Sequence, residues 1–142
     1  MEIIDRLKGI VGVGQPSIEL RDVNTPVRRG DAVRGTVVLT GGQYDAPVED
    51  VHVRLEEVRV VYTAPERPER QFWSHVAEQV FPMDHRVLKP GETIELAFAV
   101  VVPAATEATG GTIAYLLIAD TEVPGLNPKV ELEITVTAGA AE

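Results

Sequence analysis

Cysteine is absent from this chain of 142 residues. Its absence excludes a disulfide framework, a thiolate metal site and a cysteine nucleophile. A chain of this length buries roughly 70% of its unfolded surface, so it holds a core without cross-links. Because a chain without cysteine suits a reducing compartment, we expect a cytoplasmic protein.

Residues typical of catalysis are also few. The serines are Ser17 and Ser74 alone, and neither stands in a Gly-x-Ser-x-Gly nucleophile elbow. The glycines at positions 9, 12 and 14 follow no strand and open no helix, which disfavours phosphate binding. We therefore predict that the chain is not an enzyme and has no catalytic residue, no cofactor and no bound metal.

Positive charge is scarce, with 13 Lys and Arg against 22 Asp and Glu and a net charge of −9. A chain this acidic repels nucleic-acid phosphates and anionic lipid heads at long range, so we expect no nucleic-acid partner. A membrane-spanning run, which takes about 20 apolar residues, is missing as well. The longest apolar run, from Leu96 to Ala105, is interrupted by Pro103.

The sequence is rich in apolar residues at every second position, which is the pattern of half-buried strands. Turn signals separate these runs, the clearest being Arg29-Gly30-Asp31, Gly41-Gly42 and Lys89-Pro90-Gly91-Glu92. Seven or eight strands without a helix of globular length between them predict an all-β antiparallel sandwich or barrel. The predicted strands begin near Ile18, Val33, Val51, Phe72, Ile94, Ile113 and Val130.

Two local features of the strand pattern lead to further predictions. After Glu56-Glu57 the apolar phase slips by one residue, which predicts a β-bulge or a bend. Phe72 and Trp73 are neighbours on one predicted strand and therefore face opposite ways. We expect one ring in the core and the other at the surface, where an exposed aromatic side chain marks a contact patch.

The first 14 residues carry apolar side chains at helical spacing, which predicts a short amphipathic helix. Glycines weaken this helix and Pro16 ends it, so it needs a surface to dock on. Two interpretations remain open: it covers an open end of the sandwich, or it inserts into a partner's groove or a membrane surface. In the second, the partner-binding residues are Ile3, Ile4, Leu7, Ile10 and Val11.

The chain is accordingly divided into three parts. Residues 1–14 form the helical segment, residues 15–137 form the β-sandwich, and residues 138–142 form a flexible tail of small and polar residues.

Histidines and carboxylates are the remaining candidates for chemistry. His52, His75 and His85 lack the close spacing of a zinc site, and His52 falls on the polar phase of its strand. The adjacent carboxylates Glu49-Asp50 and Glu56-Glu57 stand at strand starts or on strand surfaces, which favours solvated faces over acid–base catalysis. Oxygen ligands for a cation are offered by Asp120, Glu122 and Asn127, although apolar residues interrupt that run.

Several short motifs resemble those of one bacterial family. Val33-Arg34-Gly35-x-Val37 precedes Gly41-Gly42, and Val48-x-x-Val51-x-Val53-x-Leu55 follows. Pro90-Gly91-Glu92, Phe98 and Pro103 stand further along, and the chain opens with an amphipathic start that ends at Gly12-Val13-Gly14. In order and spacing, these residues from Ile3 to Val136 resemble the sporulation-control proteins with an arrestin-like fold.

This resemblance implies an immunoglobulin-like or arrestin-like β-sandwich of seven to eight strands with a short N-terminal helix. It also implies a non-catalytic regulatory or scaffolding module that works by protein contact, in sporulation control and in cell-envelope or division processes. Members of the family continue into a second sandwich, so this chain is expected to pair with itself or with another protein. The acidic turn of the family carries fewer carboxylates here, at residues 120–129.

Two other functions remain open. The chain would be a small-ligand carrier or an enzyme if residues distant in sequence assemble a pocket around a carboxylate or histidine. It would be a membrane-peripheral regulator if the N-terminal segment binds lipid. We expect the chain to bind a protein partner of unknown identity, and this partner is a second copy of the chain if it forms a homodimer.

Overall fold

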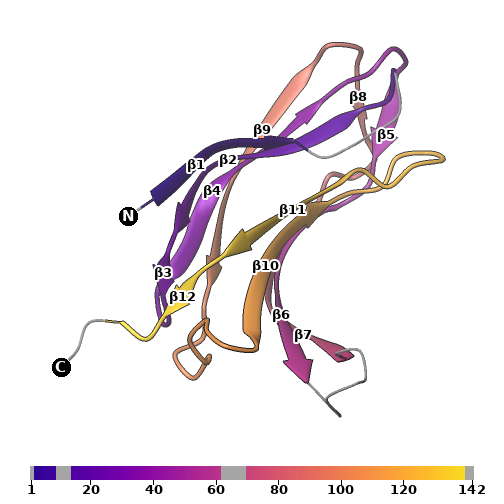
Figure 1. Cartoon of the computed structure of the whole chain (residues 1–142). Coiled ribbons are helices and arrows are strands. Elements are labelled where there is room, and N and C mark those ends of the chain that lie inside the picture. Colours follow the sequence, from indigo (N-terminus) through magenta and orange to yellow (C-terminus); the bar gives the residue numbers. More distant parts are fainter. Residues whose placement is uncertain (1, 9–13, 62–69, 140–142) are drawn as a thin grey trace.

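The computed structural model describes residues 2–8, 14–61 and 70–139, with only the backbone given for residues 2–8 and 70. Every described residue lies in a strand, a turn or a loop, and none of them is helical. Two four-stranded antiparallel sheets face each other as a sandwich (Figure 1). The predicted all-β antiparallel sandwich is therefore confirmed.

The two main sheets have the strand orders β1-β2-β4-β9 and β11-β10-β6-β7. The first contains β1 (Glu2–Lys8), β2 (Ser17–Thr25), β4 (Ala32–Thr40) and β9 (Thr93–Val101). The second contains β6 (Val51–Val61), β7 (Arg70–Phe81), β10 (Ile113–Asp120) and β11 (Lys129–Ile134). Two short pairs complete the fold, β3 (Val27–Arg28) with β12 (Val136–Thr137) and β5 (Ala46–Val48) with β8 (Arg86–Leu88). These short pairs bring the described strands to twelve, against the seven or eight expected.

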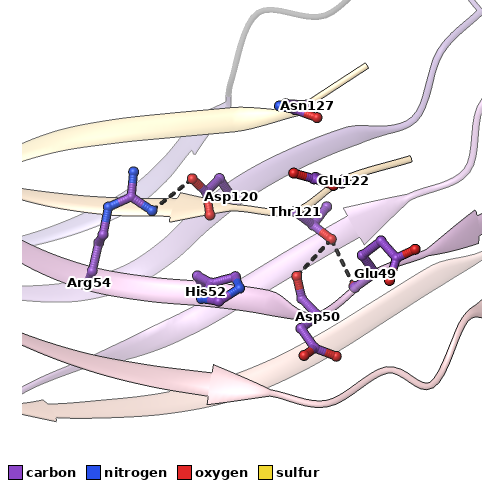
Figure 2. A pocket seen from close by; sticks show the side chains of 8 residues that line it. All are labelled: Glu49, Asp50, His52, Arg54, Asp120, Thr121, Glu122 and Asn127. Carbon is purple, nitrogen blue, oxygen red and sulfur yellow. Dashed lines mark hydrogen bonds and ion pairs between the residues drawn. The ribbon is translucent and has the colours of Figure 1, made fainter. Parts of the chain in front are cut away.

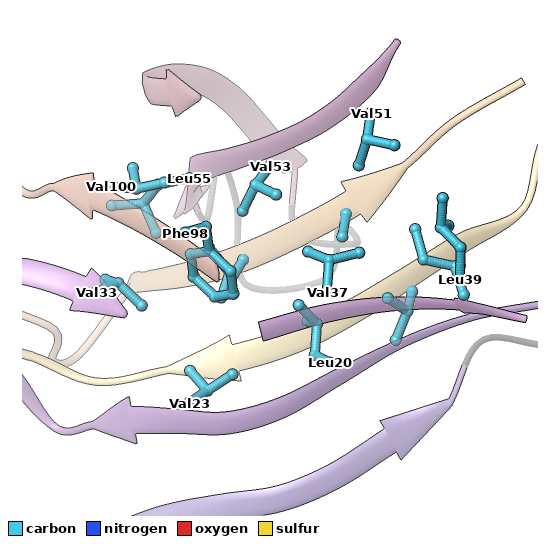
Figure 3. Close-up of a cluster of buried hydrophobic side chains, with 14 of the residues drawn as sticks. Leu20, Val23, Val33, Val37, Leu39, Val51, Val53, Leu55, Phe98 and Val100 are labelled. Atoms are coloured by element: carbon cyan, nitrogen blue, oxygen red, sulfur yellow. The ribbon is translucent and has the colours of Figure 1, made fainter. Parts of the chain in front are cut away.

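The core lies between the two sheets and is built by the alternation seen in the sequence. In β9 the buried residues are Ile94, Phe98 and Val100, whereas the residues between them are exposed or partly exposed. The same alternation in β6 buries Val51, Val53 and Leu55. Figure 3 shows these side chains meeting those of the first sheet. Burial of this apolar cluster is the main force that holds the sheets together.

The predicted N-terminal helix is wrong, because Glu2–Lys8 form the edge strand β1 beside β2. Ile4 stands opposite Val23 and Leu7 stands opposite Leu20 in this antiparallel pair. Two physical reasons account for the difference. The β-branched pair Ile3-Ile4 favours a strand, and β2 offers an unpaired edge with backbone groups to bond.

The predicted turns are confirmed, and glycine is required at the Gly41-Gly42 break. A Cβ at Gly41 would lie 1.9 Å from the carbonyl oxygen of Lys89, and one at Gly42 would lie 2.1 Å from the carbonyl oxygen of Gly14. No side chain fits where backbones approach this closely. In the neighbouring turn the Lys89 N–H donates to Glu92 Oε1 at 2.9 Å, and this bond together with Arg86 lowers the pKa of Glu92.

The irregularity predicted after Glu56-Glu57 is present as a β-bulge between β6 and β7, although its extra residue does not lie on β6. The pairing of β6 with β7 shifts between Leu55 and Glu56, where Leu55 stands opposite Ala77 and Glu56 opposite His75. Val76 is therefore the extra residue, and the bulge lies on β7. β6 itself keeps an unbroken register with β10 from His52 to Arg59, so Val58 lies on the face opposite to Leu55.

The expectation that one of the neighbouring aromatic rings enters the core is wrong. Phe72 and Trp73 are 51% and 52% exposed, and they stand opposite Arg59 and Val58 on β6. Among the described strands, β7 is the outermost of its sheet. In Figure 1 this end of β6 and β7 projects beyond the first sheet, which explains why even the inward-facing ring remains uncovered.

Candidate partner-binding groove

A groove of about 420 Å³ opens where β6 begins and β10 ends. It is formed by two stretches of chain that lie far apart in sequence. We call it the loop-end groove and define it by the residues that line it, which are Glu49, Asp50, His52, Arg54, Asp120, Thr121, Glu122 and Asn127 (Figure 2).

One wall of the loop-end groove is a tight hairpin after β10. Val123 and Leu126 exchange two backbone hydrogen bonds of 3.0 Å, and Pro124 and Gly125 lie between them. Gly125 has a φ of +79°, as the third position of a type II turn after proline requires. The Thr121 N–H also donates to the carbonyl oxygen of Pro128 at 3.1 Å, so the hairpin is closed at its base.

The floor is fixed by Thr121, which is 3% exposed. Its hydroxyl oxygen lies 2.9 Å from the carbonyl oxygen of Glu49 and 3.1 Å from that of Asp50. The Glu49 N–H donates in turn to the carbonyl oxygen of Glu122 at 2.9 Å. These contacts hold the chain before β6 against the chain after β10, so the groove is formed before any ligand arrives.

The charge of the loop-end groove is strongly negative, since four carboxylates surround one guanidinium. Arg54 donates to Asp120 at 2.7 Å, and Asp50 accepts the Met83 N–H at 3.2 Å. Within the described part of the chain, no ion pair involves Glu122, and its side chain is exposed. The groove therefore presents negative charge that its own cation does not balance.

An apolar depression of about 660 Å³ adjoins the loop-end groove and shares Glu49, Glu122 and Asn127 with it. Its other lining residues come from β5 and the hairpin, and they are Pro47, Val123, Pro124, Gly125 and Leu126. A carboxylate surface thus lies directly beside a surface of proline and aliphatic side chains.

The residues that were predicted to offer ligands for a cation, Asp120, Glu122 and Asn127, do meet in the loop-end groove. In residues 14–61 and 70–139, however, no three His, Asp or Glu side chains are arranged to hold a metal ion. One oxygen of the Asp120 carboxylate is already bound by Arg54.

The three histidines each face a glutamate at the surface. His52 Nδ1 lies 2.6 Å from Glu78 Oε2, His75 Nδ1 lies 3.3 Å from Glu56 Oε2, and His85 Nδ1 lies 3.1 Å from Glu49 Oε1. The expectation that His52 points to solvent from its strand is confirmed, since the side chain is 41% exposed. The Glu56 and Glu57 side chains, which were predicted to lie on solvated faces, are only 18% exposed, so that prediction is wrong for this pair.

Tyr115 is a buried polar residue that the sequence did not single out. Its hydroxyl donates to the carbonyl oxygen of Glu107 at 2.5 Å and lies 3.4 Å from Glu57 Oε2. Burial, followed by the charge of Glu57, raises the pKa of Tyr115 to about 12. Hydrogen bonds to Glu107 and Glu57 also raise the pKa of Arg59. This cluster joins the loop after β9 to the second sheet and is structural.

The predicted partner-binding residues lie elsewhere. Ile3, Ile4 and Leu7 are on β1, and Ile10 and Val11 lie outside the described residues. Their role in binding stays a prediction. The sequence did not connect Glu49-Asp50 with Asp120 and Glu122, because the pairing of β6 with β10 cannot be read from either strand alone.

No helix among the described residues is long and apolar enough to cross a membrane. The fold and the loop-end groove together define the class of protein. It is a β-sandwich of arrestin-like type with a preformed surface site between two loops.

The comparisons with known proteins identify the family. The sequence model of the family described as SpoOM protein matches residues 4–138, and this chain belongs to the Spo0M family. The fold resembles the crystal structure of Spo0M, sporulation control protein, from Bacillus subtilis, with a TM-score of 0.74 and 19% identity. The match covers 91% of this chain and 51% of that one, so this chain spans about half its length. No curated protein sequence matches this chain. The resemblance expected from the sequence is confirmed.

Proposed function

We propose that this chain is a non-catalytic regulator that binds a segment of a partner protein in the loop-end groove. The solved relative is named a sporulation control protein, and we infer a role of that kind for this member of the family. The observation that carries the proposal is a preformed groove in which unbalanced carboxylates adjoin an apolar depression. Such a surface recognises a partner by charge and by apolar contact together.

The partner segment is defined by this chemistry. A Lys or Arg side chain in the loop-end groove would meet Glu122 and Glu49, which both line it. An apolar residue next to it in sequence would cover Pro124 and Leu126 in the adjoining depression. The partner segment is therefore one in which a basic residue stands beside an apolar residue.

Most carboxylates that line the loop-end groove already have a partner within the chain, which favours a binding role over catalysis. Asp120 holds Arg54, Asp50 holds the backbone of Met83, and Glu49 lies beside His85. A general acid or base must instead be free to exchange a proton with a substrate. The lack of cysteine and the acidic composition support a cytoplasmic location for such a regulator.

Photocrosslinking in cells of the source organism tests this proposal. A benzoylphenylalanine placed at position 127 of the full chain should form one discrete adduct with a partner protein on irradiation. The Glu122→Lys substitution should remove that adduct, and the captured peptide should contain a basic residue beside an apolar one. The matched control places the same probe at Val101, which is 58% exposed on β9, far from the groove in sequence. Equal capture from both positions, or capture that Glu122→Lys leaves unchanged, would refute the proposal.

A further inference from the structure

A third hollow extends the binding surface beyond the apolar depression. It has a volume of about 220 Å³ and shares Val123 and Pro124 with that depression. We call it the tyrosine hollow, and its other lining residues are Gly14, Gln15, Pro16, Tyr44, Asp45 and Ala46. We propose that the partner segment continues into the tyrosine hollow and that Tyr44 binds a proline of this segment there. This proposal rests on the proposed function, because the same segment occupies the loop-end groove.

The order of the three cavities follows from the residues that they share. The apolar depression shares Glu49, Glu122 and Asn127 with the loop-end groove and Val123 and Pro124 with the tyrosine hollow, whereas the outer two cavities share none. The depression therefore lies between them. A segment that places its basic residue in the loop-end groove reaches the tyrosine hollow only after it has crossed the depression.

The tyrosine hollow is formed before a partner binds. The Gln43 N–H donates to the carbonyl oxygen of Gly14 at 2.8 Å, which fixes the loop that carries Tyr44 against the chain before β2. Ala46 and Val123 are buried and give the hollow an apolar base. A rigid site of this kind loses little entropy when a ligand enters it.

Tyr44 stands over this hollow without a partner of its own. Its side chain is 74% exposed, and no described residue forms a hydrogen bond with its hydroxyl. An aromatic ring with a polar tip offers a large contact area and one hydrogen bond at a low cost in conformational entropy. A proline ring can pack against the tyrosine ring while the hydroxyl donates to a backbone carbonyl of the segment.

The backbone that lines the depression and the hollow is poorly suited to pairing with an added strand. Pro16, Pro47 and Pro124 have no N–H to donate. The N–H groups of Val123 and Leu126 are already bonded within their hairpin. A polyproline II segment needs no strand pairing, because it docks through its side chains on surfaces lined by aromatic rings. These features together favour a proline-containing segment in an extended conformation.

Charge restricts the segment further. Asp45 is exposed and lines the tyrosine hollow, so it repels a carboxylate beside the bound proline. The segment therefore carries a basic residue, an apolar residue and a proline in that spatial order, with no acidic residue at the proline end.

Phage selection with the full chain as bait tests this proposal. From random dodecapeptides, the wild type should enrich peptides in which a basic residue stands beside an apolar one and a proline lies on the far side of the apolar residue. The Tyr44→Ala chain should lose the enrichment of proline and keep that of the basic residue. Enrichment of basic and apolar residues without proline would overturn this proposal and leave the proposed function intact, whereas enrichment of neither pattern would refute both.

A double-mutant cycle on one selected peptide isolates the contact. Tyr44→Ala and the replacement of the peptide's proline by alanine should each weaken binding at least about fivefold, and together they should weaken it little more than either alone. Tyr44→Phe keeps the ring and should retain most of the affinity. The matched control is Phe72→Ala, which removes a ring that is 51% exposed on β7 and should leave binding unchanged. Strictly additive losses would overturn the proposal.

Photocrosslinking identifies the occupant of the tyrosine hollow in cells of the source organism. A benzoylphenylalanine at position 44 should capture the same partner as the probe at position 127, at a peptide that contains proline. Capture of the chain's own residues or of a second copy of the chain would overturn the proposal.

Discussion

Arg54 on β6 donates to Asp120 at the end of β10 across a distance of 2.7 Å. This contact ties together two strands at the floor of the loop-end groove (Figure 2). Both side chains are about three-quarters buried, and Arg54 also lies 3.8 Å from Glu56. The pair balances part of the negative charge that the groove concentrates.

Removing the guanidinium should therefore destabilise the fold. Arg54→Ala leaves the carboxylates of the groove without their cation, and we expect a loss of about 1 kcal/mol in the free energy of unfolding. Urea denaturation of Arg54→Ala, Asp120→Ala and the double variant measures the coupling between the two side chains. Arg34→Ala, at an exposed position of β4, is the control. Strictly additive losses would show that the contact contributes nothing.

Thr121 should be the residue that holds the loop-end groove in shape. Thr121→Val keeps the size of the side chain but removes the hydroxyl between the carbonyl oxygens of Glu49 and Asp50. Leaving one of these carbonyl oxygens without its donor should cost about 1–3 kcal/mol in thermal or urea unfolding. The same change at the exposed Thr93 should be nearly neutral. Comparable effects at the two positions would contradict the assigned role.

Gly41 should tolerate no side chain. A Cβ there would overlap the carbonyl oxygen of Lys89, whereas a Cβ at Gly30 would meet no atom within 4 Å. We expect Gly41→Ala to destabilise the chain by more than about 3 kcal/mol, because the backbones of two turns must separate. Gly30→Ala should cost only about 1 kcal/mol for its positive φ. The midpoints of urea unfolding measure the two losses of stability. A Gly41→Ala chain as stable as Gly30→Ala would refute the packing described.

Stability should fall at high pH because of Tyr115. Its pKa of about 12 in the folded chain lies above the usual value of about 10, so folding favours the protonated phenol. The stabilisation is complete below about pH 10 and is lost as the pH rises toward 12, by roughly 2–3 kcal/mol in total.

Urea unfolding between pH 9 and 12 measures this loss. Tyr115→Phe should remove this part of the pH dependence, and Tyr44→Phe, at a residue that is 74% exposed, should retain it. An unchanged profile for Tyr115→Phe would contradict the assignment.

The sequence predicts the sandwich well, because alternation in strands such as β9 records directly which face is buried. It does not predict which strands pair, so the meeting of Glu49 with Glu122 could not be foreseen. The sequence also does not show how far the opposite sheet extends over a given strand. For this reason the exposure of both Phe72 and Trp73 was not expected. The N-terminal helix was predicted from the spacing of Ile3 and Leu7, which fits one face of a helix. The same spacing also fits one face of a strand, and here the segment joins the edge of β2 as a strand.

A charge swap in the loop-end groove tests the central claim most directly. Calorimetry would compare the full chain and its Glu122→Lys variant for binding to a synthetic copy of the segment captured from position 127. We expect wild-type binding that weakens with salt, a loss of at least about tenfold in Glu122→Lys, and recovery when the basic residue of the segment becomes glutamate. Equal affinity of the two chains for the unaltered segment would contradict the account.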